Sequence, residues 1–259
     1  MEKIMNNKKL MKIILLITAL ALVAVSCKQE TKQTAEQPTV ENEKQSLPKN
    51  KDKEQSNVEL IPAGYRLFEE LHGDLNGDSK DDNVLIIKGT DKKNFVQDEY
   101  RGELDRNRRG IMIFLNTGTG YELALENRSC FSSENEDGGV YFPPELSVKV
   151  EKGNLYIAYD HGRYGSWQYT FRYRNGEFVF IGYDAYDREM PGFDADGREI
   201  EVVEINKSFN FLTKKVFTKS VTHYDDGEDK TDEKWDTFVV NRLVKLTDIE
   251  DFDEFRNWD

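Results

Sequence analysis

Oxygen-bearing side chains alternate along one short, glycine-containing stretch of the chain, between residues 72 and 82. The candidate metal ligands are four side chains and one backbone carbonyl: those of Asp74, Asn76, Asp78 and Asp82, and the carbonyl of Lys80. Calcium accepts about 6–8 oxygen ligands in flexible geometry, whereas magnesium keeps more of its water. The spacing therefore predicts a structural calcium site within a single loop, residues 74–82.

The residues that follow the loop distinguish between two known types of calcium loop. An EF-hand would place a bidentate Glu at the twelfth loop position, where this chain has Leu85. The loop instead resembles the FG-GAP type of calcium loop, found in integrin-like propeller blades and in exported bacterial proteins, in which an aspartate-rich loop joins two strands. The resemblance covers Tyr65 to Lys88 and implies a structural metal. The alternative is a metal-free turn, because Asn, Asp and Gly are good turn formers.

A complete propeller is not expected. Integrin-like propellers repeat the loop several times, whereas this chain has one full copy and two fainter echoes, at residues 194–197 and 225–232. Radial closure needs at least about four blades. We therefore expect an incomplete propeller-like or a sandwich-like arrangement of strands.

Cys27 marks an abrupt change from apolar to polar sequence. Four lysines precede an apolar run over residues 13–25, which suits a signal-peptide core of ~7–15 residues and is shorter than the about 20 residues that span a bilayer. The segment Ala24-Val25-Ser26-Cys27 resembles the lipobox of bacterial lipoproteins, whose cysteine is acylated. It implies a signal peptide at residues 1–26 and a lipid anchor on Cys27 in a membrane. The alternatives are an ordinary secretory peptide and an uncut anchor.

Residues 27–57 are predicted to form a disordered tether. They are rich in Lys, Gln, Glu, Thr and Asn, and such a composition buries too little apolar surface to offset its ordering entropy. Lys28 stands where an aspartate would, by resemblance to enterobacterial lipoproteins, favour retention in the inner membrane. We expect a lipid-anchored protein of the cell envelope, at the outer membrane in a Gram-negative organism. These features together resemble exported lipoproteins of the Bacteroidetes type with a single calcium loop.

Charge and cysteine content exclude some partners and bonds. The net charge is −13, which argues against nucleic acid as a partner, because binding phosphates requires a basic face. The chain has two cysteines, so acylation of Cys27 leaves Cys130 without a partner in its own chain. We expect no disulfide, and a partly buried thiol at Cys130.

Aromatic and polar residues gather between residues 156 and 173. The candidate binding surface consists of Tyr159, His161, Arg163, Tyr164, Trp167 and Tyr169. Alternate strand residues share a face, so part of this set should point away from the core. Exposed, such residues stack on sugar rings or anchor a protein partner. The alternative is a core face with ordinary aromatic cross-strand pairs.

Catalytic motifs are missing from the sequence. The three histidines, His72, His161 and His223, are isolated, and no GxSxG, HExxH, Walker or paired CxxC motif occurs. We therefore expect a non-enzymatic protein with a binding or structural role in the envelope, and a protein or a glycan as its partner. The alternatives are an immunity or inhibitor lipoprotein that uses acidic loops against a basic protein, and a glycan-active enzyme with a hidden carboxylate pair.

Residues 58–259 are predicted to form one β-rich domain, an antiparallel meander of short hairpin-connected strands. Asn175-Gly176, flanked by alternating aromatic residues, is the strongest hairpin signal. An acidic loop is expected at 225–232, a short helical turn at 249–255, and no long amphipathic helix, so the class is all-β. Strands are expected at residues 84–87, 110–115, 121–125, 146–150, 154–159, 166–174, 177–183, 200–205, 215–223 and 237–246.

Overall fold

The predicted all-β class is confirmed by the computed structural model, which describes residues 60–137 and 142–255. Apart from 3-10 turns of three residues, the regular elements of these ranges are strands. No helix in these ranges is long and apolar enough to cross a membrane. The predicted signal peptide, the acylation site at Cys27 and the tether at 27–57 lie outside the described residues.

The N-terminal sheet has four antiparallel strands in the order β1-β2-β5-β6. Its strands are β1 (Tyr65–Gly73), β2 (Asp82–Gly89), β5 (Arg109–Asn116) and β6 (Tyr121–Phe131). A small excursion separates β2 from β5 and consists of the 3-10 turn η2 (Lys92–Asn94), β3 (Phe95–Asp98) and β4 (Gly102–Asp105). The two strands of the excursion pair only with each other among the described strands.

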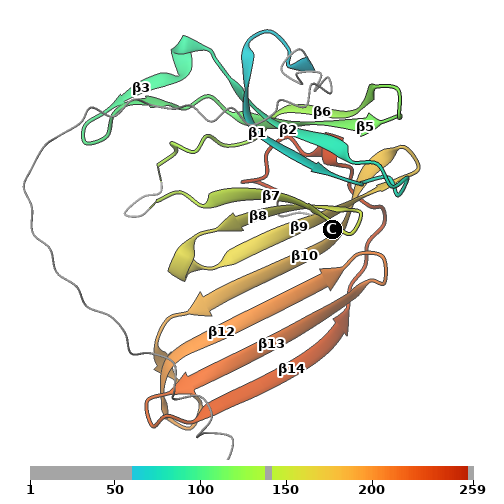
Figure 1. Ribbon diagram of the computed structural model, residues 1–259. Coiled ribbons are helices and arrows are strands. Elements are labelled where there is room, and N and C mark those ends of the chain that lie inside the picture. The colour runs from blue at the N-terminus through green and yellow to red at the C-terminus, as the bar shows by residue number, and fades with distance from the viewer. Residues whose placement is uncertain (1–59, 138–141, 256–259) are drawn as a thin grey trace, which may run out of the picture. The chain divides into compact units, whose positions relative to one another are not determined.

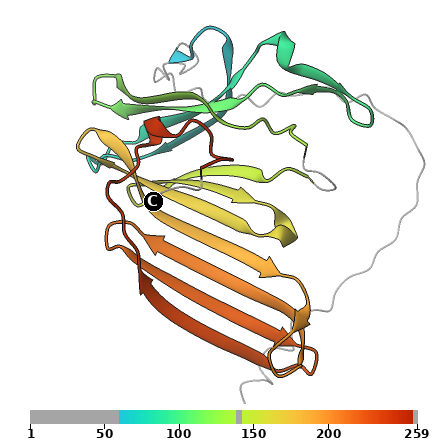
Figure 2. The same ribbon diagram turned by 180° about the vertical axis from the view of Figure 1, so that it is seen from behind.

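The large sheet is an antiparallel meander, as predicted. Its order in space, β7-β8-β9-β10-β12-β13-β14, follows the chain, and β11 pairs with β12 beside this path (Figures 1 and 2). The first four strands are β7 (Glu145–Glu151), β8 (Asn154–Asp160), β9 (Ser166–Arg174) and β10 (Glu177–Glu189). The others are β11 (Gly192–Phe193), β12 (Glu199–Asn210), β13 (Lys215–Tyr224) and β14 (Asp229–Thr237).

The hairpin predicted at Asn175-Gly176 joins β9 to β10. Both residues have positive φ, 54° and 86°, which is the backbone requirement of a two-residue type I′ turn. Tyr173 and Phe178 lie opposite each other beside the turn, with ring centroids 5.0 Å apart. The turn and this pair together fix the register of the two strands.

The main core lies between the two sheets. One cluster of buried side chains contains Val84 and Ile111 from the N-terminal sheet and Ile157 and Phe171 from the large sheet. The chain after β14 contributes Phe252, which stacks on Phe131 with ring centroids 5.1 Å apart. The arrangement is thus sandwich-like where the N-terminal sheet covers β7 to β10 (Figure 1).

The last three strands of the large sheet lie beyond this cover. Figures 1 and 2 show β12, β13 and β14 extending away from the N-terminal sheet. All nine residues of β14 are exposed, and β13 is mostly half-buried. This part of the sheet is therefore held mainly by its backbone ladder and by cross-strand pairs.

The structure corrects the end of the predicted strand pattern. The strand expected at 237–246 is wrong: the strand is β14, and residues 238–245 have no regular structure apart from one bridge between Lys245 and Val179. The apolar alternation there arises because this segment returns to the core, where Val240 and Leu246 are buried. The acidic loop is shorter than expected, since its last residues, from Asp229, belong to β14.

The helical turn predicted at 249–255 lies earlier in the chain. A 3-10 turn, η4 (Leu246–Asp248), precedes the predicted range, and residues 252–254 form only a hydrogen-bonded turn. The strands β3, β4 and β11 were not expected, because each has only two to four residues, too few to show a periodic pattern. Tertiary contacts rather than local propensity place them.

A buried lysine joins the excursion to the N-terminal sheet. The Lys88 side chain is fully buried, and its ammonium donates to the Asp105 carbonyl at 2.9 Å and to Glu134 Oε1 at 2.6 Å. The Asp105 carboxylate lies 3.2 Å from the same ammonium. Burial acts to raise the pKa of Asp105, but hydrogen bonds from Asn107 and Lys88 prevail and hold that pKa below its usual value.

Replacing this lysine should destabilise the fold. In Lys88→Met the Asp105 carbonyl and the Asp105 and Glu134 carboxylates lose their shared ammonium donor, so we expect the free energy of unfolding to fall by about 1–3 kcal/mol. Urea denaturation of the chain carrying Cys27→Ser measures it, with Lys92→Met, an exposed lysine of η2, as the control. The difference between parent and variant should shrink below about pH 4, because the stability that a depressed carboxyl pKa provides is lost as the pH falls through it. Equal losses in the two variants would contradict this role for Lys88.

Candidate functional site

The predicted calcium loop joins β1 to β2 and is a chain of side-chain-capped turns. Asp74 accepts hydrogen bonds from the backbone N–H groups of Gly77, at 2.6 Å, and Ser79, at 2.9 Å. Asn76 accepts from the N–H of Asp78 at 2.9 Å. Gly77 and Ser79 have positive φ, 83° and 66°. The alternating Asx residues thus direct the backbone of the loop.

Asp82 differs from the other predicted ligands in its burial. It is fully buried at the start of β2, and its two oxygens accept from the N–H groups of Leu75, at 2.8 Å, and Asn116, at 2.9 Å. Leu75 is itself part of the core. Asp82 therefore fastens the calcium-type loop to the β5–β6 connection through charge-assisted hydrogen bonds.

The side-chain oxygens of the loop suit a hard cation. In this conformation, however, they already accept hydrogen bonds from N–H groups of the chain itself. Asp78 accepts a hydrogen bond from the Lys80 ammonium at 2.7 Å and another from the Lys80 N–H at 3.0 Å, and these bonds, the first more than the second, lower the pKa of Asp78. A carboxylate retains further lone pairs, yet an ion at Asp78 would displace that ammonium. Over the described ranges no three or more His, Cys, Asp or Glu side chains are grouped to hold a metal. Calcium stays a prediction.

A hollow of about 520 Å³ lies at the β8–β9 hairpin, on the face of the large sheet that also forms the core. We call it the Trp167 hollow. It is lined by His161, Tyr164, Trp167, Tyr169, Tyr183, Ala185, Asp187, Lys207, Phe209, Phe252 and Asp253. Four of the six residues of the predicted binding surface therefore come together in one place.

Strand register produces this hollow. Trp167 lies opposite Ala185, which lies opposite Lys207, and in the next row Tyr183 lies opposite Phe209. The small Ala185 side chain between two long ones leaves the space that the surrounding rings enclose. Tyr169 closes the inner side, with its ring 5.3 Å from Tyr183 and 5.1 Å from Phe252.

The hairpin loop that borders the hollow is held in one conformation. Asp160 accepts from the N–H of Gly162 at 2.6 Å, and His161 Nε2 lies 3.0 Å from the Phe142 carbonyl. Gly165 has φ of 111°, and a Cβ there would lie 2.3 Å from the Tyr186 carbonyl. Only glycine allows β10 to approach this closely, so the loop geometry depends on Gly165.

Charged groups of both signs border the Trp167 hollow. Asp187 comes from β10, Lys207 from β12 and Asp253 from the C-terminal segment. Loss of hydration, followed by the charge of Asp251, raises the pKa of Asp253. The lining thus combines apolar ring faces with hydrogen-bond acceptors and one ammonium donor.

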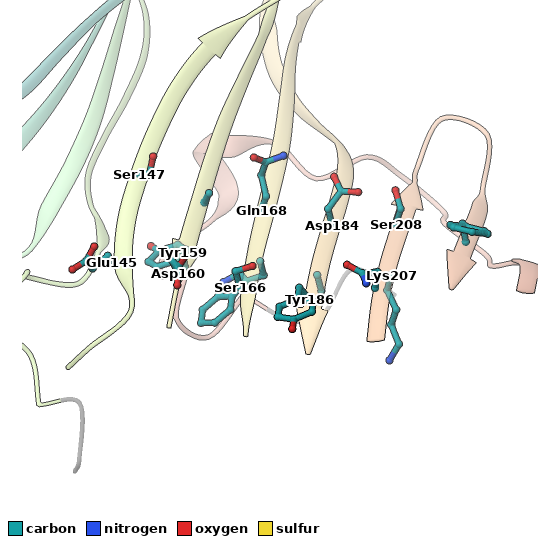
Figure 3. A pocket seen from close by; sticks show the side chains of 15 residues that line it. Glu145, Ser147, Tyr159, Asp160, Ser166, Gln168, Asp184, Tyr186, Lys207 and Ser208 are labelled. Carbon is teal, nitrogen blue, oxygen red and sulfur yellow. The ribbon is translucent and has the colours of Figure 1, made fainter. Parts of the chain in front are cut away.

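The opposite face of the same strands carries a second hollow, of about 470 Å³, which we call the outer hollow. Figure 3 shows Ser147, Gln168, Asp184 and Ser208 along it, and the strand register places these residues in one row, with Ala158 between Ser147 and Gln168. Polar side chains and Ala158 form this row, and the aromatic residues Tyr186 and Phe217 also line the hollow. Trp167, Ala185 and Lys207 border both hollows.

The predicted binding residues divide by burial. Tyr159 and Tyr169 are each 2% exposed and belong to the core cluster. Tyr159 stacks on Trp167 at 5.5 Å, and its hydroxyl has no hydrogen-bond partner among the described residues. Tyr164 is 44% exposed and receives a hydrogen bond from Arg163 at 3.0 Å. Cys130 is fully buried, which raises the pKa of its thiol.

Residues from distant parts of the sequence complete the Trp167 hollow and were not predicted. They are Tyr183, Ala185, Asp187, Lys207, Phe209, Phe252 and Asp253. A local signal existed for three of them, because Tyr183, Ala185 and Asp187 alternate along one strand and so share a face. Lys207 and Asp253 required knowledge of the pairing of β10 with β12 and of the return of the C-terminal segment.

Comparisons of the chain with known protein families, with curated proteins and with solved structures gave no match.

Removal of the Asp82 carboxylate tests its fastening role. Asp82→Ala leaves the N–H groups of Leu75 and Asn116 without acceptors, so we expect the free energy of unfolding to fall by about 3 kcal/mol. Asp81→Ala, an exposed neighbour, is the matched control and should change it little. Chemical denaturation in the presence of a chelator separates this role from metal binding. Equal stability of the two variants would refute it.

Proposed function

We propose that the chain is an exported lipoprotein, anchored through acylated Cys27, whose β domain binds a neutral glycan in the Trp167 hollow without catalysing a reaction on it. The observation that supports this most is the gathering of Trp167, Tyr183 and Phe209 around a small alanine, with ionisable groups of both signs at the border. Export and anchoring rest on the sequence around Cys27.

A sugar ring matches this lining in its chemistry. It offers an apolar C–H face to aromatic rings, which are large rigid contact surfaces. Its hydroxyls donate to carboxylates such as Asp187 and accept from the Lys207 ammonium. Because acidic and basic groups are both present, the hollow does not select a strongly charged ligand. A neutral polysaccharide is therefore the favoured class.

A basic protein partner is less well supported. The acidic turn after β13 is compensated internally, since Arg198 contacts Asp226 at 2.7 Å and Glu228 at 3.2 Å. The same guanidinium lies 3.8 Å from the centre of the Tyr224 ring. The backbone N–H of Glu228 and then Arg198 lower the pKa of Asp226. Charges that are already paired contribute less to attraction of a basic target.

We also propose that the calcium-type loop binds calcium as a structural ion. Its support is the alternation of oxygen donors from Asp74 to Asp82 on a turn whose backbone they already direct. The ion would restrain the connection between β1 and β2 and would take no part in glycan binding.

Calcium should raise the midpoint of thermal unfolding if this is correct. Binding to the folded state alone adds about 2.7 kcal/mol at a hundredfold excess over Kd. The measurement compares chelator, calcium and magnesium on the chain carrying Cys27→Ser, and Asp78→Ala should remove the calcium response. An equal response of parent and variant would exclude the loop as the site.

Filling the Trp167 hollow should weaken glycan binding and leave the fold intact. Ala185→Leu occupies the space between Trp167 and Lys207, so we expect affinity for neutral glucans, mannans or galactans to fall by at least about tenfold, or 1.4 kcal/mol. Ala158→Leu, which intrudes on the outer hollow, is the matched control. Isothermal titration measures binding, and unfolding curves verify the fold.

The two variants also separate the alternatives. Loss of binding in Ala158→Leu alone would move the site to the outer hollow and contradict the proposal. Absence of binding to every neutral polysaccharide, with salt-sensitive binding of a basic protein instead, would support the inhibitor alternative.

A further inference from the structure

The strand β14 ends the large sheet with an unpaired edge. It pairs with β13 on one side, and within the described part of the chain no strand pairs with its other side. All nine of its residues are exposed, and it forms the lower border of the sheet in Figure 1. An edge of this length presents a row of backbone donors and acceptors to another strand.

Charges alternate in sign along one face of this strand. The face carries Lys230, Asp232, Lys234 and Asp236, because every second strand residue points the same way. Within the strand, Lys230 lies 3.0 Å from Asp232, and Lys234 contacts Asp236. The pattern is therefore basic, acidic, basic, acidic at a spacing of two residues.

We propose that β14 pairs with β14 of a second copy of this chain, antiparallel, about a twofold axis at Glu233. In this register, residues equally distant from Glu233 lie opposite each other. Lys230 then faces Asp236 of the other copy, and Asp232 faces Lys234. The twofold axis repeats both contacts, so all charges of this face meet an opposite charge. Opposite charges directly across a strand pair are stabilising.

The same charges reject the neighbouring registers. An axis at Asp232 would bring Lys230 opposite Lys234, and an axis at Lys234 would bring Asp232 opposite Asp236. Like charges directly opposite are destabilising. Axes at Thr231 or Trp235 restore opposite signs but lose pairing along part of the strand. The charge pattern thus selects the register that uses all nine residues.

The other face of β14 is compatible with this register. Glu233, at the axis, lies 3.3 Å from the Lys219 ammonium, so the two glutamates that meet are each accompanied by a lysine. Trp235 is 68% exposed and packs against Phe217 in a tilted arrangement, with ring centroids 4.8 Å apart. In the pair, Thr231 of the other copy lies opposite Trp235 and covers part of its ring.

Pairing through one strand gives a small interface, below the about 1,200 Å² of stable complexes. We therefore expect weak association in solution, with one sheet continuing across both copies. This inference does not depend on glycan binding, because β14 contributes no residue to the Trp167 hollow. Either proposal can fail without the other.

Cysteine cross-linking tests the register. In the chain carrying Cys27→Ser, the remaining Cys130 is buried, and Glu233→Cys places two thiols opposite each other at the axis. Opposite strand residues have Cα atoms about 4.5–5.5 Å apart, within disulfide range, so a disulfide dimer should form under oxidising conditions.

In Thr231→Cys the two thiols lie about 13 Å apart along the strands, and no such dimer should form. A mixture of Thr231→Cys and Trp235→Cys should cross-link only with each other. Equal cross-linking of the Glu233 and Thr231 variants would overturn the register.

Charge reversal tests the source of the association. Sedimentation velocity over a concentration series should show a dimer for the chain carrying Cys27→Ser and none for the Lys230→Asp, Lys234→Asp variant. Adding Asp232→Lys and Asp236→Lys recreates the alternation with signs exchanged and should restore the dimer. A monomer at every concentration, or a dimer that is indifferent to these changes, would refute the proposal.

Discussion

The structure depends on the packing of a short sheet against only part of a longer one. The N-terminal sheet covers β7 to β10, and the cluster of Phe171, Phe180 and Phe252 fills the space between them. Fully burying a side chain of this size contributes about 1.5–3 kcal/mol. Because the cover stops before β12, the large sheet passes from a packed core to a solvated layer within two strands (Figure 1).

Both proposed interaction sites follow from this asymmetry. Where the N-terminal sheet ends, aromatic side chains on the core face of the large sheet no longer pack against it, and the Trp167 hollow lies at this position. Phe252 and Tyr169 take part in both the core and the hollow. Farther out, β14 has no hydrophobic cover, so its stability comes from the ladder with β13 and its specificity from charge. Apolar contacts thus form the site beside the core, and the pattern of charges defines the site at the far edge of the sheet.

The sequence predicts what local chemistry determines. The Asn175-Gly176 hairpin, the all-β class and most strand positions follow from turn residues and period-two alternation, which act over a few residues. The charged strand β14 escaped prediction because its residues lack apolar alternation, whereas the apolar segment after it resembles a strand but packs into the core. The partners of Trp167, from Tyr183 to Asp253, come together only through strand register and the return of the C-terminal segment. The buried Lys88 cluster likewise joins residues that no local pattern connects.

The central claim is that the Trp167 hollow receives the ligand, and an NMR titration of indole N–H signals tests it most directly. The chain contains three tryptophans; Trp167 borders the hollow, whereas Trp235 lies on β14. Because Trp167 borders both hollows, the titration is done on the Ala158→Leu variant, whose outer hollow is obstructed. On addition of a neutral oligosaccharide, the account predicts a saturable shift of the Trp167 signal and an unchanged Trp235 signal. A ligand that binds with the Trp167 signal unmoved would contradict the account.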